Sequence, residues 1–224
     1  MIRALVALSL TFASTIVLAA DPAQIQQLLD DQSNFFESQG ENVPQEVDLQ
    51  STIGSVHMNA NFALIDQAEG VGEHAEITQN GTNNVAGILQ GFGDDNRASI
   101  TQTGAANYAA ITQSGSNNLV DTLIQQGDNN SAKVVQHNND NTLSLSQYDD
   151  FNRADIEQFG GTSLNVTQTN AGGSASATNE LELKAYAAPG ANPNFAPVQL
   201  NGPGQTQLYV CNGDPGYCSQ VLPH

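Results

Sequence analysis

Between Asn61 and Gln168 the chain alternates polar and apolar residues in short units that recur every eleven or twelve residues. Examples are "NVAGILQ" (84–90), "NYAAITQ" (107–113) and "NSAKVVQ" (130–136). Positions one, three, five and seven hold Asn, Ala, a branched aliphatic residue and Gln, while charged side chains stay almost entirely at even positions. Because alternate residues of an extended strand point to opposite faces, this pattern predicts strands with one buried side.

The links between the units hold four or five residues dominated by Gly, Asn, Ser and Asp. These residues tolerate left-handed backbone conformations, so the chain is expected to reverse at each link. Ten units with two strands per turn predict an all-β solenoid of about five coils. The sixth unit, "NLVDTLIQ", has one extra residue, which predicts a β-bulge near Asp121.

The polar residues at the ends of each unit have a structural explanation in such a stack. Coils about 4.8 Å apart place each Gln above an equivalent Gln, so their side-chain amides can hydrogen-bond along the stack. A lone buried amide would cost roughly 1–3 kcal/mol, and a ladder removes that penalty for all but the end coils. The predicted ladder residues are Asn61, Gln67, Gln79, Asn84, Gln90, Asn96, Gln102, Asn107, Gln113, Asn118, Gln125, Asn130, Gln136, Asn141, Gln147, Asn152, Gln158 and Gln168.

The composition narrows the classes of partner. The chain has 224 residues and carries five Lys and Arg against 23 Asp and Glu, a formal charge of −18. With so few basic residues it has no patch to collect phosphates, which argues against nucleic acid and against anionic membrane surfaces.

Residues 1–60 form two segments before the repeats. Residues 1–20 place one Arg before an apolar run that closes on small residues, the layout of a secretory signal peptide, so we expect an exported mature chain that begins near Asp21. A membrane anchor is the alternative for this run, and no later segment is expected to insert into a membrane. Residues 21–60 are predicted to contain a short amphipathic helix that begins at Asp21 and Pro22.

Residues 171–224 break the period and follow the repeat region 61–170 as a small irregular tail. Its Gly and Pro residues predict loops between short strands such as "TNELELKAY" and "TQLYVC". Cys211 and Cys218 flank an Asp-Pro-Gly turn, and in an exported chain such a pair predicts a disulfide in preference to a metal site.

The spacing of Gln, four residues, Asn, five residues, Gln resembles the repeat of curlin, the subunit family of bacterial curli fibres. It occurs at Gln79, Asn84 and Gln90, and it recurs through the region 61–168. The resemblance implies an exported subunit that folds as a two-stranded solenoid and polymerises into amyloid fibres on the cell surface, for adhesion and biofilm matrix. It implies as partners other copies of the chain, other curli subunits and the curli export machinery.

A physical mechanism of polymerisation accompanies this resemblance. Each end of a solenoid presents a strand with unpaired backbone groups, which folded proteins usually block. If the first and last coils share one pattern, each copy offers a template for the next, and head-to-tail contacts then build a filament.

Other classes of function remain open from the sequence. The chain has no recognisable catalytic motif, its four His residues are scattered, and we expect neither an enzyme nor a cofactor. Acids in the links, such as Asp94, Asp128 and Asp150, would bind Ca²⁺ only loosely, because their spacing fits neither an EF-hand nor the glycine-rich nonapeptide roll. A monomeric solenoid that acts as an adhesin or an ice-binding module is a further alternative.

The tail also leaves open whether the chain is a bulk subunit, a nucleator or a cap of a fibre. If the tail folds back over residues 162–168, it covers the edge that a following subunit would use. The long Gly/Pro-rich span from Ala171 favours instead a tail that lies to the side and leaves that edge open.

Overall fold

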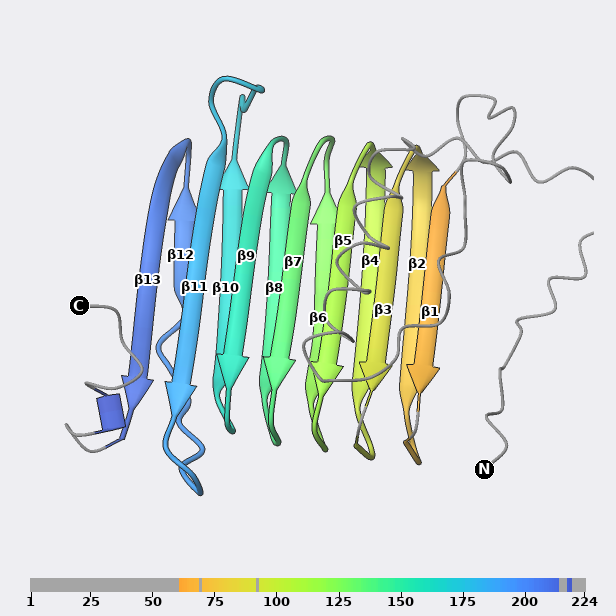
Figure 1. The fold of residues 1–224 in the computed structure, drawn as a ribbon. Helices are drawn as coiled ribbons and strands as arrows, with labels where there is room; N and C mark the ends of the chain where they lie inside the picture. The colour runs from red at the N-terminus through yellow and green to blue at the C-terminus, as the bar shows by residue number, and fades with distance from the viewer. Residues whose placement is uncertain (1–60, 69, 92, 214–216, 219–224) are drawn as a thin grey trace, which may run out of the picture.

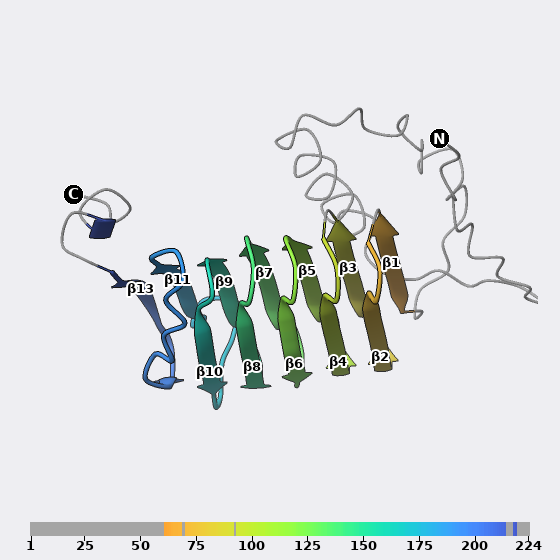
Figure 2. The same cartoon turned by 90° about the horizontal axis from the view of Figure 1, so that it is seen from below.

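The computed structural model describes residues 61–68, 70–91, 93–213 and 217–218. In this part of the chain two parallel β-sheets lie face to face and form a solenoid of about six turns (Figures 1 and 2). One sheet has the order β1-β3-β5-β7-β9-β11-β13, and the other has the order β12-β10-β8-β6-β4-β2. The predicted signal peptide and N-terminal helix lie outside the described residues.

The strands are β1 (Phe62–Ala68), β2 (His74–Thr82), β3 (Val85–Gly91), β4 (Arg97–Ala105), β5 (Tyr108–Ser114), β6 (Leu119–Gln126), β7 (Ser131–His137), β8 (Thr142–Asp149), β9 (Asn152–Phe159), β10 (Ser163–Asn170), β11 (Asn179–Ala187), β12 (Val198–Asn201) and β13 (Gly204–Asn212).

Equivalent residues of successive coils stack in register. Gln67 pairs with Gln90, and Gln90 pairs with Gln113, so each Gln lies beside its counterpart one coil on. The register shifts once, between Val120 and Thr122 of β6, where Asp121 is the extra residue. The position of the bulge confirms the prediction. The bulge lets an eight-residue unit stack between two seven-residue units with its Gln still in register.

The core is a thin apolar layer between the two sheets. It consists of the residues at positions three and five of each unit, such as Ala86 and Ile88 of β3 and Ala98 and Ile100 of β4, all at most 3% exposed. In several strands, such as β3 and β4, a small residue and a large residue alternate on this face, whereas in β8 both core residues are Leu. The predicted buried face is confirmed.

Glycines in the links are required where the turns stack most tightly. Gly81, Gly104 and Gly127 lie one coil apart and all have positive φ, at 116°, 117° and 125°. A Cβ atom on Gly104 would lie 2.1 Å from the carbonyl oxygen of Gly127. A side chain at this position would therefore force neighbouring coils apart as well as strain the backbone.

The solenoid continues beyond the last repeat, and the tail does not lie to the side. β11 pairs in parallel with β9, β12 with β10, and β13 with β11, which adds strands to both sheets. The expectation of about five coils is therefore too low, and the expectation that the edge of residues 162–168 stays open is wrong. The strands predicted within "TNELELKAY" and "TQLYVC" are confirmed as β11 and β13.

A second, smaller apolar cluster lies on the outer face of the seven-stranded sheet. Val85, Tyr108 and Ala110 are at most 6% exposed there, and Phe62 and Leu64 pack against them. The alternating pattern predicts an exposed outer face throughout, so it fails at these strands. Even positions that carry apolar residues, as in "NVAGILQ", are the signal of this second buried surface.

Candidate functional site

Two continuous ladders of glutamine amides run along the solenoid, one in each sheet. In the first, each Nε2 donates to the Oε1 of the next Gln at 2.7–2.9 Å, through Gln67, Gln90, Gln113, Gln136 and Gln158. In the second, the same bond joins Gln79, Gln102, Gln125, Gln147 and Gln168 at 2.8 Å each. The predicted glutamine ladders are confirmed.

From Gln79 onward, each amide nitrogen in these ladders also donates to a backbone carbonyl of the facing strand. Gln102 Nε2 reaches the carbonyl oxygen of Val85 at 3.0 Å, and Gln125 Nε2 reaches that of Tyr108 at 2.8 Å. Both N–H groups of an interior Gln are therefore satisfied while the side chain is fully buried. The ladders thus join neighbouring coils and also tie one sheet to the other.

The asparagines form a second pair of ladders with the opposite donor direction. Asn107 donates to the Oδ1 of Asn84 through its backbone N–H at 3.1 Å and its Nδ2 at 3.0 Å, so each Asn donates toward the preceding coil. In the seven-stranded sheet the ladder runs from Asn61 to Asn152, and in the other sheet it joins Asn96, Asn118 and Asn141. All eighteen predicted ladder residues take part in these rows.

Two residues outside the predicted set complete the asparagine ladders. Glu73 accepts from Asn96 Nδ2 at 3.1 Å, and the pKa of its carboxyl is raised because burial penalises the charged form. At the other end Thr162 donates its backbone N–H and its hydroxyl to Asn141 Oδ1. Their place at the first position of a unit, where other units have Asn, is the sequence feature that could have identified both as ladder residues.

The N-terminal coil, β1 and β2, carries the Ala, Ile and Gln of the repeat pattern in both strands and lies at an open end of the solenoid. Ile65 is 43% exposed, and Ala75 and Ile77 are half-buried. Among the described residues, no donor reaches the Oε1 of Gln67 or Gln79, although the Nε2 of each is bonded. This end therefore presents two amide acceptors beside an apolar row.

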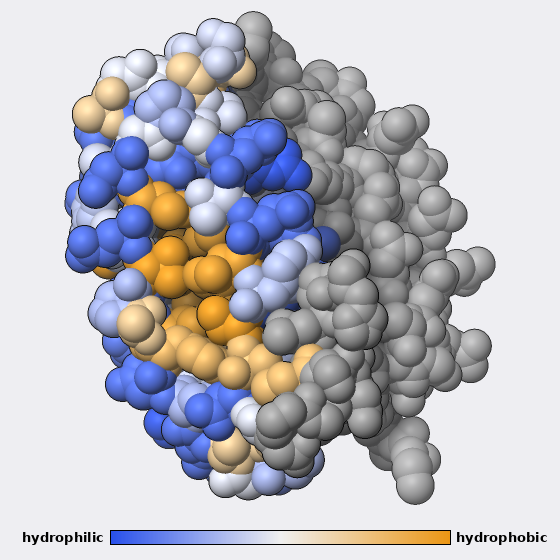
Figure 3. Space-filling model, turned by 90° about the vertical axis from the view of Figure 1, so that its left-hand side faces the viewer, coloured by the Kyte–Doolittle hydropathy of each residue, from blue (hydrophilic) through white to orange (hydrophobic). Residues whose placement is uncertain are grey.

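The C-terminal coil does not repeat that pattern, so the condition that the first and last coils share one pattern is not met. β13 places Val210 beside Ala185 and Gly204 beside Asn179, while β12 places Leu200 beside Gln168. Figure 3 looks onto this end and shows an apolar centre ringed by hydrophilic residues. Its half-buried apolar side chains are Phe195, Val198, Leu200, Leu208 and Val210.

A disulfide closes the chain where it leaves β13. Cys211 and Cys218 are bonded, with their Cα atoms 5.8 Å apart, as predicted. The hydroxyl of Tyr217 donates to the carbonyl oxygen of Ala187 at 2.9 Å, which fixes this loop to the end of β11. The disulfide therefore holds the last described residues against the final coil.

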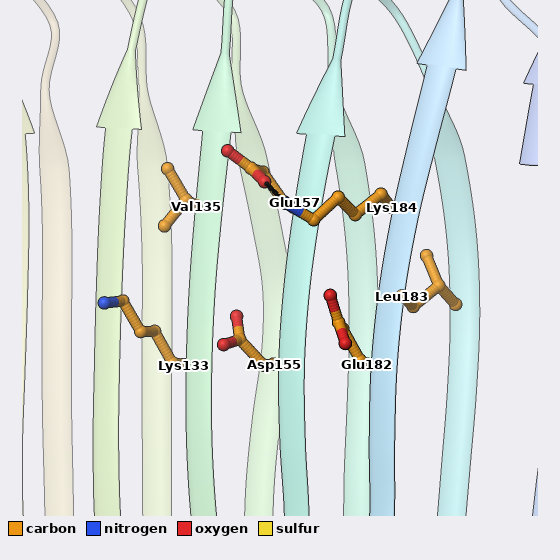
Figure 4. A pocket seen from close by; sticks show the side chains of 7 residues that line it. All are labelled: Lys133, Val135, Asp155, Glu157, Glu182, Leu183 and Lys184. Atoms are coloured by element: carbon orange, nitrogen blue, oxygen red, sulfur yellow. Dashed lines mark ion pairs between the residues drawn. The ribbon is translucent and has the colours of Figure 1, made fainter. Parts of the chain in front are cut away.

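The outer face of the seven-stranded sheet has a shallow depression lined by charged residues of β7, β9 and β11 (Figure 4). Lys184 Nζ lies 2.8 Å from one oxygen of Glu157, and His137 Nε2 lies 3.1 Å from the other. The bond to His137 and then that to Lys184 lower the pKa of Glu157 to about 2. Because these side chains bind one another across strands, they help to hold the sheet together.

The acids of the links are hydrogen-bonded to the backbone of the preceding coil. Asp128 Oδ1 accepts from the N–H of Ala105 at 2.7 Å, and Asp150 Oδ1 accepts from the N–H of Asp128 at 2.7 Å. Over the part of the chain that the structure describes, no group of three or more His, Cys, Asp or Glu is placed to hold a metal ion. The same residues contain no apolar helix long enough to cross a membrane.

The repeat pattern, the register and the ladders together correspond to a known repeat family. Three segments, residues 74–104, 93–122 and 104–137, match the curlin associated repeat. The resemblance seen in the sequence is confirmed for these residues, which run from β2 to the end of β7. The curlin repeat and the solenoid support a structural role that resembles that of a curli subunit. No match was found among curated proteins or among solved structures.

Proposed function

We propose that this chain is an exported structural subunit of a curli-type amyloid fibre and that it joins its neighbours by stacking of coils. The observation that carries the proposal is the pair of in-register glutamine ladders that reach the N-terminal coil with their acceptors open. A further coil with the same pattern would satisfy both acceptors and cover Ile65 and Ile77 at once.

Export rests on the predicted signal peptide of residues 1–20, and a place on the cell surface follows from the curlin repeat. The outer surface of the assembled fibre would then serve in adhesion and in biofilm matrix. Its high negative charge keeps the chain soluble before assembly. The proposed partners are curlin-repeat subunits and the export machinery that delivers them.

The monomeric adhesin or ice-binding module receives less support. Such a module needs a flat outer row of regular side chains, whereas an outer row of this solenoid mixes acids with hydroxyl and aliphatic residues, as at Glu157, Thr112 and Val135. The ladders are buried, so a monomeric binder would have no use for an open ladder end.

The test is incorporation into fibres. The mature chain, labelled with a fluorophore, is incubated with growing fibres of a curlin-repeat subunit, and the washed fibres are examined by fluorescence and X-ray diffraction. We expect label in the fibres, with cross-β reflections near 4.7–4.8 Å and roughly 10 Å. Label that stays in the supernatant at every ratio of the two proteins would refute the proposal.

A further inference from the structure

We propose that the two ends of this solenoid do not fit each other, and that the N-terminal coil docks on the last coil of a different curlin-repeat subunit while the C-terminal coil ends the stack. This inference rests on the proposed function and assigns the chain a place in the fibre, as a terminal subunit with one stacking end. Its partner is defined by chemistry: a last coil that keeps Gln and Asn at the stacking positions.

The ladders have a direction, which decides what the N-terminal coil can bind. Every Gln donates its Nε2 toward the C-terminal end, so the coil that docks on β1 and β2 must present two Gln donors to the Oε1 atoms of Gln67 and Gln79. In the asparagine ladder of the same sheet, the backbone N–H of each Asn donates to the Asn Oδ1 of the preceding coil, so the docking coil must present an Asn Oδ1 to the backbone N–H of Asn61.

The last coil of this chain supplies none of these groups. At the positions that would meet Gln67, Gln79 and Asn61 it has Val210, Leu200 and Gly204. A second copy stacked there would bury two amide acceptors without donors. Each unpaired buried acceptor weakens an association by about five-fold or more, so self-stacking would be about 30-fold weaker or worse than stacking on a matched coil.

The donors of the two glutamine ladders are also consumed inside the chain. Gln158 Nε2 lies 3.0 Å from the backbone oxygen and the hydroxyl of Thr162, and Gln168 Nε2 donates to the carbonyl oxygen of Asn179 at 3.1 Å. In interior rungs the equivalent bond goes to the next Gln, so these bonds close the ladders before the last coil begins.

On the β12 side, the edge of the C-terminal coil is poorly suited to strand addition. β12 has only four residues, and it follows Pro197, while Pro203 directly precedes β13. Short edge strands and prolines, which lack an N–H, are the devices by which natural sheets avoid edge-to-edge pairing. On the β12 side, therefore, the apolar centre of this end has only a short strand edge, whereas on the β13 side the strand is nine residues long and what is missing is the ladder side chains.

The test restores the missing groups at the C-terminal end of the full mature chain. The triple variant Gly204→Asn, Leu200→Gln, Val210→Gln supplies the Asn and both Gln, and a Cβ atom on Gly204 would meet no atom within 4 Å. We expect the wild type to remain without long fibres when incubated alone, while this variant elongates by itself. A matched control, Leu200→Met with Val210→Leu, keeps the apolar end and should behave as the wild type.

A second experiment measures the N-terminal end directly. Adding Gln67→Leu and Gln79→Leu to the triple variant gives a chain that can present only its restored C-terminal coil. We expect it to bind wild type one to one in sedimentation, about 30-fold or more tightly than wild type binds itself. Wild type that carries Glu76→Gln and Thr78→Val, at outward positions of β2, should bind it as well as the unmodified wild type does. Circular dichroism confirms that each variant is folded.

The outcomes separate this inference from the function on which it rests. Wild type that polymerises alone as fast as the triple variant would overturn the inference and would leave the curli-type function intact. Wild type that neither binds the restored coil nor enters fibres of a curlin-repeat subunit would overturn the function itself.

Discussion

A single glutamine in the middle of a ladder should contribute far more to folding stability than one at its end. Gln125 is fully buried and makes three hydrogen bonds, each 2.8 Å long: it accepts from Gln102 Nε2 and donates to Gln147 Oε1 and to the carbonyl oxygen of Tyr108. Gln125→Ala removes all three and leaves Gln147 Oε1 buried without a donor. At roughly 1–3 kcal/mol for each orphaned group, we expect a loss of about 3–5 kcal/mol in the free energy of unfolding.

The end of the same ladder provides the comparison. Gln79 makes two hydrogen bonds, to Gln102 Oε1 and to the carbonyl oxygen of Phe62, and its own Oε1 accepts none. Gln79→Ala leaves Gln102 Oε1 at the open end, where water can replace the lost donor. We therefore expect a loss of only about 1–2 kcal/mol. Thr101→Ala, at an outward position, should change stability by about 0.5 kcal/mol or less.

The assay is urea denaturation of the full mature chain, kept dilute and followed by circular dichroism. The double variant Gln102→Ala, Gln125→Ala loses the bond between them once, whereas the two single variants each lose it. We expect the double variant to cost about 1 kcal/mol less than the sum of the singles. Gln113→Ala with Gln125→Ala, from different ladders, should be additive. Equal losses at Gln79 and Gln125, or additivity within one ladder, would refute the ladder energetics.

Three further predictions use other features of the fold. In the same urea assay, the loss in free energy of unfolding should be larger for Gly104→Ala than for Gly190→Ala, by about 2 kcal/mol or more. Both glycines have positive φ, but a Cβ atom only at Gly104 would meet a backbone atom of the next coil. The lowered pKa of Glu157 stabilises the fold above pH 4.5, and this contribution is lost as the pH falls toward 2, so Glu157→Gln should flatten the pH dependence of the urea midpoint in that range. Deletion of residues 171–224 exposes the ladder ends on β9 and β10, so it should speed seeded fibre growth and give longer fibres in electron micrographs. Reduction of the disulfide should have a smaller effect in the same direction. Unchanged growth on deletion would exclude a capping role for this region.

The repeat spacing was sufficient to predict the solenoid, its register and its ladders. The Asn at the start and the Gln at the end of each unit both mark which residues face inward, so the register is indicated twice. A pairing shifted by one residue would bury charged side chains such as Lys133. The same redundancy located the bulge, because the extra residue at Asp121 shows up as a Gln that arrives one position late.

The continuation of the solenoid into the tail could not be predicted with the same rule. β11 keeps Asn179, Leu181 and Leu183 at positions one, three and five, but Ala185 replaces the Gln, and the longer link before it breaks the period. Without the Gln at position seven, only Asn179 is left to mark the register of this strand. β12 is four residues long and is held in place by its pairing with β10, which is a tertiary effect that short-range patterns do not encode.

The bonds of each ladder join residues that lie only 21 to 23 positions apart in the sequence. Every coil therefore completes its contacts with the next coil as soon as about one further turn of chain is available, and no coil waits for residues at the far end. In such a one-dimensional array, folding can begin at any coil and advance by one turn at a time. A chain that emerges slowly through a narrow passage, N-terminus first, can therefore fold its first coils outside the passage. The remaining length can still be unfolded inside it.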